Sequence, residues 1–538
     1  MSGAMIKSGF QGTRRLFFFR LRLERRSVII WALSISIFVA AYIPVINDLL
    51  FTSATPDVII DLMKNPAMIA IVGPLFGEDY TFGASYANYM LVFSMLAPAI
   101  MSLILVSSNL RRDEELGRDE ILKAKPVGRL ANASSIMLVN LTANLLIFVL
   151  SFIFMSFAGA KLLDLTGILS FTLSLFLSGV FFGSATLLFS QLFRSHRAVM
   201  GAGFTLLFGS YILRALGDLY FEPLSYLSPL GLLTRAQAFV ENNFTPHLIL
   251  FLASLVLVMV SLILEGRRDL AASVLPEKKI EKSGSSYGLS NVFVLSLRLS
   301  LSTFLGWLSA LIILAAMYGS VIGDMQTYLE SSEMLRAIFN PQGGDFTRQF
   351  LYMLAGVMSI FTAIPALILF LRLWTEEKRG YTELVLAQSV SRSSYLASYL
   401  GISLISSLLL QLVSALSLVL VAGNVLVKLM DPSEYIIAML NYLPAIWFLV
   451  GLAVLLLGVL PRLSSFVYIY LVFSFIVIYL GRMTDMPGFI GNLTPFNYIP
   501  QHRISGSDYL PLVIILVLTL FMTILGFVGY RKRDQRAD

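Results

Sequence analysis

Apolar stretches of about twenty residues recur along the whole length of this chain and are separated by short charged segments. A stretch of that length crosses a lipid bilayer as one α-helix. Inside hydrocarbon, only helices and closed β-barrels pair every backbone amide and carbonyl group, and barrel strands would show alternating segments of about ten residues instead. Because 57% of the 538 residues are hydrophobic and only 13% are charged, we predict an all-α polytopic membrane protein.

The uncharged windows predict about twelve transmembrane helices. Six are expected in the first half of the chain, near residues 28–50, 87–108, 133–157, 167–193, 199–216 and 247–264. Six more are expected near residues 303–322, 350–371, 395–422, 440–460, 466–481 and 509–529. Their central portions hold no Asp, Glu, Lys or Arg, and the most polar residues there are Asn140, Asn144, Gln191 and Gln411.

The distribution of basic residues predicts the orientation. If both termini are cytoplasmic, the outer segments carry only nine of the 39 Lys and Arg residues. Basic residues accumulate on the cytoplasmic side of membrane proteins, so we predict cytoplasmic termini. The formal net charge of +7 then reflects topology, and nucleic acid is not an expected partner, because the chain has no soluble domain with a basic stripe.

The two halves of the chain repeat each other. The segment EELGRDEILKAKPVGR (Glu114–Arg129) aligns with EKRGYTELVLAQSVSR (Glu377–Arg392). The matched pairs are Glu114 with Glu377, Gly117 with Gly380, Glu120 with Glu383, Ala124 with Ala387, Val127 with Val390 and Arg129 with Arg392. Since each half has the same predicted topology, we expect a parallel duplication, a pseudo-dimer of residues 1–270 and 298–538. A polar cytoplasmic linker, residues 271–297, joins the halves.

The chain has no evident means of driving transport by itself. A proton- or sodium-coupled transporter normally keeps an ionisable residue within the membrane, and the central portions of the predicted spans have none. No Gly-Lys dipeptide occurs in the sequence, so a phosphate-binding loop of the G-x-x-x-x-G-K-[ST] type is excluded. We therefore expect a transport subunit, not an enzyme, that binds no cofactor and is powered by a separate ATPase.

The loop after the second span of each half, about residues 111–130 and 374–393, is the expected contact for that ATPase. In each loop a charged turn is followed by a glycine and a short amphipathic stretch. Such a helix could lie parallel to the membrane, with its acids toward a partner and Leu122 or Leu384 toward lipid or neighbouring helices. The alternative is a solvated turn that only satisfies the charge rule for cytoplasmic loops.

Four further segments have structural predictions. Residues Gly12–Arg26 have the pattern of an amphipathic interfacial helix, as a membrane anchor or as a contact with the ATPase. Two irregular apolar segments, about residues 218–235 and 486–503, predict re-entrant hairpins, as caps on an exit route or as structural plugs. The motif GVFFG (Gly179–Gly183) predicts close helix packing. The three histidines lie in unrelated segments, so no metal site is expected.

These features together resemble a known family. Each half resembles the permeases of ABC-2 type exporters. It has six spans with an amphipathic helix before them, an EELGR or EKRG loop after the second span and a re-entrant segment before the sixth. Two such halves in one chain resemble the fused subgroup of polyketide antibiotic and multidrug exporter permeases. The resemblance implies the plasma membrane of a prokaryote as the location and a hydrophobic or amphipathic substrate, such as an antibiotic, a drug or a lipid-like molecule.

The resemblance also implies partners and site residues. Two copies of a soluble ATP-binding subunit would bind ATP and Mg²⁺ and would hold the two loops, the coupling helices, in their grooves. ATP-driven closure would push the two halves together, and substrate would leave along a path bounded by the second and fifth spans. The implied coupling positions are Glu114, Glu115, Gly117, Arg118 and Glu120 in the first half, and Glu376, Glu377, Gly380 and Glu383 in the second.

Two alternatives stay open at this point. Lys378 and Arg379 precede Gly380, whereas Arg118 follows Gly117, so the two contacts with the ATPase need not be equivalent. The chain could also be a twelve-span secondary transporter driven by an ion gradient, which the uncharged span interiors and the paired acidic loops disfavour.

Overall fold

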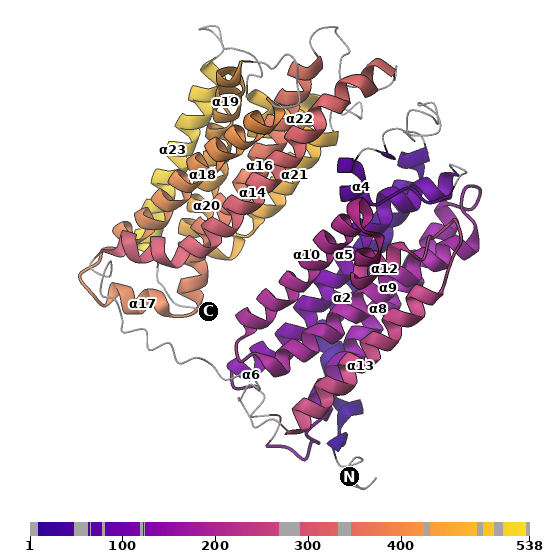
Figure 1. Ribbon diagram of the computed structural model, residues 1–538. Helices are drawn as coiled ribbons and strands as arrows, with labels where there is room; N and C mark the ends of the chain where they lie inside the picture. The colour runs from indigo at the N-terminus through magenta and orange to yellow at the C-terminus, as the bar shows by residue number, and fades with distance from the viewer. Residues whose placement is uncertain are drawn as a thin grey trace. The chain divides into compact units, whose positions relative to one another are not determined.

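The computed structural model describes residues 9–47, 63–64, 66–77, 81–118, 122, 124–267, 291–331, 346–423, 431–480, 488–499 and 509–533. The chain divides into two compact units, Met1–Ile280 and Glu281–Asp538 (Figure 1), and each unit is described by itself. The predicted linker, residues 271–297, lies outside the described residues as far as residue 290. The helix that begins the second unit starts at Val292, so the last residues assigned to the linker are helical.

The elements of the first unit are all helices within the described residues. They are α2 (Thr13–Ile46), α4 (Pro66–Val72), α5 (Phe82–Ser107), the π-helical η2 (Ser108–Arg112), α6 (Asp113–Glu115), α8 (Ala131–Ala158), α9 (Leu165–Leu192), α10 (His196–Tyr220), α11 (Glu222–Leu227), α12 (Pro229–Thr234) and α13 (Thr245–Arg267). Helix α5 has most of its length buried, and it packs against α9, while α2 packs against α8.

The second unit is built in the same way. Its described elements are α14 (Val292–Ser331), α16 (Phe346–Lys378), α17 (Tyr381–Leu386), α18 (Arg392–Ala422), α19 (Pro432–Leu440), α20 (Leu443–Val459), the 3₁₀ turns η3 (Pro461–Leu463) and η4 (Pro495–Tyr498), α21 (Phe466–Leu480), α22 (Gly488–Gly491) and α23 (Leu510–Lys532). Helix α16, the second long helix, is the most buried of them, as α5 is in the first unit.

Twelve helices among the described residues are long and apolar enough to cross a membrane. Each overlaps one of the predicted spans, which confirms the fold class expected from the sequence. The physical reason is local: a run of about twenty apolar residues can satisfy its backbone in lipid only as a helix. The protein is therefore an all-α, multi-pass membrane protein.

Each unit has two distinct ends. We call the end that carries residues 108–130 or 379–391 the loop end, and the end that carries residues 221–234 or 488–498 the hairpin end. In the first unit α6 and α4 lie at opposite ends, and in the second unit α17 and α22 do so (Figure 1). Residues predicted to form the coupling loops and the re-entrant segments are thus held at opposite ends of each helix bundle.

The predicted interfacial helix, Gly12–Arg26, is not a separate element. Helix α2 runs without a break from Thr13 to Ile46, so the basic segment extends the first span. Gly12 precedes it with a positive φ of 88°. Arg20, within this segment, is 4% exposed because it has hydrogen-bond partners on neighbouring helices.

The GVFFG motif has the packing role that its spacing predicted. A Cβ atom at Gly179 would lie 1.8 Å from Oδ1 of Asn144, and one at Gly183 would lie 2.2 Å from Nδ2 of Asn140. The two glycines of α9 thus make room for the two buried asparagines of α8. Nδ2 of Asn144 also donates to Oγ of Ser102 on α5 at 3.0 Å, so polar side chains help to join three helices at the centre of the first unit.

Candidate functional site

The first coupling loop begins as a continuation of α5. The helix widens into the π-helical η2, resumes for one turn as α6 and ends at Gly117, whose φ is +70°. The amide of Gly117 donates to the carbonyl of Glu114 at 3.1 Å. A positive φ of this kind is the usual left-handed end of a helix and strongly favours glycine, which explains the glycine at this position.

Glu114, a predicted coupling residue, is directed into the first unit. Its carboxylate pairs with Arg111, one turn earlier, and the two side chains are 7% and 1% exposed. Nε of Arg111 donates to the carbonyl of Phe193 at 2.7 Å, at the end of α9. Glu114 therefore holds the loop to α9 through Arg111.

Glu115 is exposed but also has an internal partner. Its Oε1 accepts a hydrogen bond of 2.6 Å from the backbone amide of His196, the first residue of α10. A carboxylate at this position satisfies one of the unpaired amides of the helix and interacts favourably with the helix dipole. The loop is thus tied to the start of the fifth span as well as to the end of the fourth.

Arg20 joins this loop to the first and third spans. Its guanidinium donates to Asn132 of α8 at 2.6 Å and to Asn109 of η2 at 3.0 Å, and it pairs with Asp113 at 3.3 Å. The opposite carboxylate oxygen of Asp113 pairs with Arg118 at 3.1 Å. A buried arginine with several partners fixes the position of this loop relative to α2 and α8.

Two exposed side chains lie beside the glycine of the first loop. Leu116 is 55% exposed, and the side chain of Arg118 is 65% exposed. These two residues flank the left-handed Gly117, whose missing Cβ would meet nothing within 4 Å. Glu120, Ile121 and Lys123 lie outside the described residues.

The second coupling loop starts with two acids at the end of α16. Oε1 of Glu376 pairs with Nε of Arg372 at 3.2 Å. Glu377 is buried and pairs with Arg533, which follows the last turn of α23. The guanidinium of Arg533 also lies over the rings of Tyr530 and Trp374, at 5.0 and 5.6 Å from their centroids.

Gly380 repeats the conformation of Gly117. Its φ is +73°, and its amide donates to the carbonyl of Glu377 at 3.0 Å. The short helix α17 follows it, with Glu383 in its first turn. Thr382 is buried, whereas Glu383 is exposed and Tyr381 and Leu384 are 49% and 69% exposed.

The two loops therefore share a turn and differ in their anchors. Glu114 and Glu377 stand at matched positions before matched left-handed glycines, yet Glu114 pairs within its own helix and Glu377 pairs with the last helix of its unit. The sequence alignment found the common turn. It did not find the partners of the two glutamates, because Arg111 and Arg533 do not occupy corresponding positions in the two halves.

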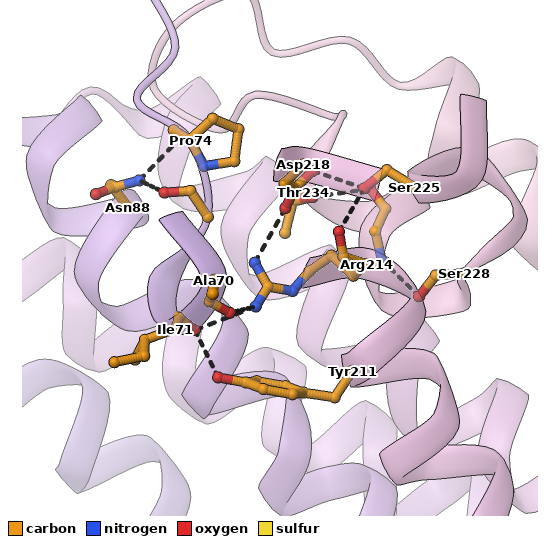
Figure 2. Close-up of polar contacts among 12 residues, drawn as sticks. Ala70, Ile71, Pro74, Asn88, Tyr211, Arg214, Asp218, Ser225, Ser228 and Thr234 are labelled. Atoms are coloured by element: carbon orange, nitrogen blue, oxygen red, sulfur yellow. Dashed lines mark hydrogen bonds and ion pairs between the residues drawn. The ribbon is translucent and has the colours of Figure 1, made fainter. Parts of the chain in front are cut away.

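A second polar site lies at the hairpin end of the first unit (Figure 2). Arg214 of α10 is completely buried, and its guanidinium donates to the carbonyl of Ala70 on α4 at 2.6 Å and pairs with Asp218 at 3.0 Å. The hydroxyl of Tyr211 donates to the carbonyl of Ile71 at 2.8 Å. Helix α4 is thus held against α10 by a cation and a phenol that bind its last carbonyl groups.

Asp218 is the centre of this cluster. Its side chain is completely buried and also pairs with Arg235 at 2.9 Å, while Oγ of Ser225 donates to it at 2.6 Å. Arg235 makes a further pair of 3.0 Å with Glu222, which is 61% exposed. One carboxylate thereby joins α10, α11 and the residue after α12, so the predicted re-entrant segment is two short helices fixed to the fifth span.

The sequence analysis missed this cluster because it ended the fifth span near residue 216. Helix α10 continues to Tyr220 and brings Asp218 beneath the short helices. Arg214 and Asp218 are four residues apart, a spacing that places opposite charges on one face of a helix. That spacing was the one feature of the sequence that could have indicated this ion pair.

The hairpin end of the second unit is held differently. The hydroxyl of Tyr470 donates to the carbonyl of Leu493 at 2.6 Å, and that of Tyr498 donates to the carbonyl of Asn492 at 3.0 Å. Within residues 488–499, which are all that the structure describes of this segment, no ion pair occurs. The rest of the predicted segment, as far as residue 503, lies outside the described residues.

One cavity lies beside the second coupling loop. It has a volume of about 370 Å³ and opens between the first turns of α14, the last turns of α16 and the start of α21. Arg372, Trp374, Glu376 and Arg379 contribute to its wall, so the residues that anchor this loop also line a space of ligand size.

The histidines have local structural roles where the structure describes them. Nε2 of His247 hydrogen-bonds with Ser174 at 2.9 Å within the first unit, and Nδ1 of His196 hydrogen-bonds with Ser107 at 2.8 Å. His502 lies outside the described residues. Among the described residues, no three His, Asp or Glu side chains form a group that could hold a metal ion.

Comparison with known proteins assigns these features to a transporter family. The sequence profile of the family "Multidrug efflux system permease Rv1217c, C-terminal domain" matches residues 15–264 and 289–531. The chain is also 29% identical over 542 residues to the multidrug efflux system permease protein Rv1217c of Mycobacterium tuberculosis, and the alignment covers 98% of this chain and 96% of that relative. The profile match includes the described helices of both units. This chain therefore belongs to the family of the multidrug efflux system permease Rv1217c.

Proposed function

We propose that this chain is the transmembrane permease of an ATP-driven exporter of the ABC-2 type, which moves hydrophobic or amphipathic compounds out of a prokaryotic cell. Two copies of a separate soluble ATP-binding subunit, carrying ATP and Mg²⁺, bind at the loop ends of the two units. Both chain termini are cytoplasmic in this arrangement. The name of the matched relative supports efflux of several drugs as the activity.

The observation that carries the proposal is the pair of left-handed glycine turns. Gly117 and Gly380 follow the most buried long helix of their units, and exposed apolar side chains lie near each: Leu116 in one loop, and Tyr381 and Leu384 in the other. Exposed apolar residues at a fixed turn suit a partner groove better than water. Force on either turn would pass directly into α5 or α16.

The internal contacts of the acids refine the expected role of the loops. Glu114, Glu115 and Glu377 connect each loop to other helices of its unit, so we propose that they transmit movement and do not touch the ATPase. The contact surface in this proposal consists of Leu116, Arg118, Tyr381, Glu383 and Leu384.

A direct test uses the permease together with its proposed ATP-binding subunit. Leu116→Asp and Leu384→Asp should each weaken co-purification of the two proteins. Each should also lower the ATP-dependent transport of drug into the lumen of inside-out vesicles. Leu227→Asp is a matched control, since Leu227 is 73% exposed but lies on α11 at the hairpin end.

The same vesicles distinguish the alternative function. Transport that continues without ATP and responds to a pH gradient alone would establish an ion-driven secondary transporter and reject the proposal. The buried Asp218 does not favour that alternative, because its carboxylate already has two guanidinium partners and serves to fix the hairpin.

A further inference from the structure

The cavity beside the second coupling loop has the dimensions of a binding site. Its volume of about 370 Å³ falls in the range of about 300 to 1,000 Å³ that small-molecule sites occupy. All of its lining residues belong to the second unit.

Part of the cavity lining is apolar. Ile368, Leu369 and Leu371 lie on α16, one turn before the polar end of that helix. Such a wall favours hydrocarbon over ions or sugars.

The lining is also rich in hydrogen-bond donors. Arg372 and Arg379 contribute guanidinium groups, and Thr303, Ser464 and Ser465 contribute hydroxyl groups. The one carboxylate, that of Glu376, already pairs with Nε of Arg372 at 3.2 Å. The lining therefore carries a net positive charge of one.

Arg379 is the group best placed to bind a ligand. It is exposed, it lines the cavity, and its side chain makes no ion pair or hydrogen bond with any residue that the structure describes. Arg372, in contrast, donates to the carbonyl of Leu299 on α14 as well as pairing with Glu376. One guanidinium thus shapes the cavity, and the other can bind an anion in a bidentate manner.

We infer that this cavity binds the anionic head group of an amphipathic molecule, with the apolar lining residues covering the start of its hydrocarbon chain. The inference deepens the proposed function by naming a substrate class, and it rests on that proposal for the step of transport. Binding itself requires only this chain.

Ligand binding would act directly on the second coupling loop. Arg379 precedes the left-handed Gly380, and Glu376 precedes the buried Glu377. An anion that draws Arg379 into the cavity would change the conformational mobility of the turn at Gly380. We propose that this turn contacts the ATPase.

Tryptophan fluorescence can report binding at this site. The chain has four tryptophans, and Trp374 lines the cavity, with Nζ of Lys378 at 4.8 Å from its ring centroid. Replacing Trp31, Trp307 and Trp447 with Phe leaves Trp374 as the only tryptophan. Its emission is then followed in the purified full-length chain during titration with short-chain phosphatidylglycerol, short-chain phosphatidylcholine or inorganic phosphate.

We expect saturable binding of phosphatidylglycerol with a dissociation constant about tenfold lower than that of phosphatidylcholine, because the first head group has a net negative charge. Arg379→Ala should raise the constant for phosphatidylglycerol about tenfold and Arg379→Lys should raise it less. Lys532→Ala removes a nearby exposed cation that does not line the cavity and should have no effect.

Three results would contradict the inference. Equal affinity for the two lipids would remove the preference for anionic head groups, and unchanged affinity in Arg379→Ala would remove the site. Inorganic phosphate that binds as tightly as phosphatidylglycerol would indicate a site for small free anions. None of these results bears on association with an ATPase, so this inference and the proposed function can fail separately.

Discussion

Both carboxylate oxygens of Glu377 accept hydrogen bonds from the guanidinium of Arg533, which lies 156 residues later in the chain. The pair connects the end of α16, just before the second coupling loop, to the end of α23. Arg392, at the start of α18, donates to the carbonyl of Arg533 at 2.9 Å. Three spans of the second unit therefore meet at the position where we propose that the ATPase acts.

Removing the charge of Glu377 should loosen this junction. We expect Glu377→Gln to lower the free energy of unfolding by about 2 kcal/mol, because Arg533 loses its buried charged partner. Unfolding in detergent solution measures this change. Glu383→Gln is the control, since Glu383 is exposed and should change stability by less than about 0.5 kcal/mol. Equal effects of the two substitutions would contradict the assignment.

The left-handed glycines should be intolerant of a side chain for conformational reasons. Gly117→Ala and Gly380→Ala each place a Cβ atom at a positive φ, at a cost of about 1 kcal/mol, although neither Cβ would meet a neighbouring atom. We expect both variants to fold and to lower the stimulation of ATP hydrolysis by the permease.

Two further variants test whether the backbone conformation of the glycine causes that loss of stimulation. Gly380→Asn should retain more stimulation than Gly380→Ala, because asparagine adopts the left-handed conformation more readily. Gly306→Ala, on α14 in open space, should have no effect. If Gly380→Ala stimulates ATP hydrolysis normally, the turn is not required for coupling.

Asp218 should be among the residues most sensitive to substitution. Asp218→Asn leaves the buried guanidinium groups of Arg214 and Arg235 without their shared carboxylate, and we expect a loss of about 3 kcal/mol in unfolding free energy. Limited proteolysis should also cleave the variant near α11 and α12. Glu222→Gln, at the exposed side of the same cluster, should behave like the unmodified protein, and an equally stable Asp218→Asn variant would show that the cluster does not hold the hairpin.

The glycines of α9 offer a test of packing at the centre of the first unit. Gly183→Val would bring a Cβ atom within 2.2 Å of the amide of Asn140, and we expect a loss of about 2 kcal/mol from overpacking. Thermal unfolding in detergent measures it. Gly209→Ala on α10 is the control, because its Cβ would have no atom within 4 Å and stability should not change. A loss of stability as large as that of Gly183→Val would show that helix geometry, not packing, causes the effect.

Much of the fold could be predicted because its signals are local. The length of each apolar run fixes a span wherever it occurs in the chain, and the twelve predicted spans correspond to the twelve long apolar helices among the described residues. The matched Gly117 and Gly380 were visible in the repeat, and both have the left-handed conformation that such a glycine suggests. The small-residue spacing of Gly179 and Gly183 likewise indicated close packing.

The partners of the charged residues could not be predicted in the same way. Arg533 meets Glu377, and Arg20 meets Asp113, only after helices distant in sequence have packed together. Helical periodicity states which face a residue occupies, but it does not state which neighbour will face it. The cavity beside Arg379 depends on three helices for the same reason, and the sequence gives no indication of its volume.

The central claim is that an external ATPase drives this permease through its two exposed loop turns. The most direct measurement is drug efflux by vesicles that contain the permease and its ATP-binding subunit, with Leu116→Asp and Leu384→Asp combined and with Leu227→Asp as the control. We predict that the double variant folds normally but loses both ATPase binding and ATP-dependent efflux. Full efflux by the double variant, or efflux by the permease without any ATPase, would contradict the account.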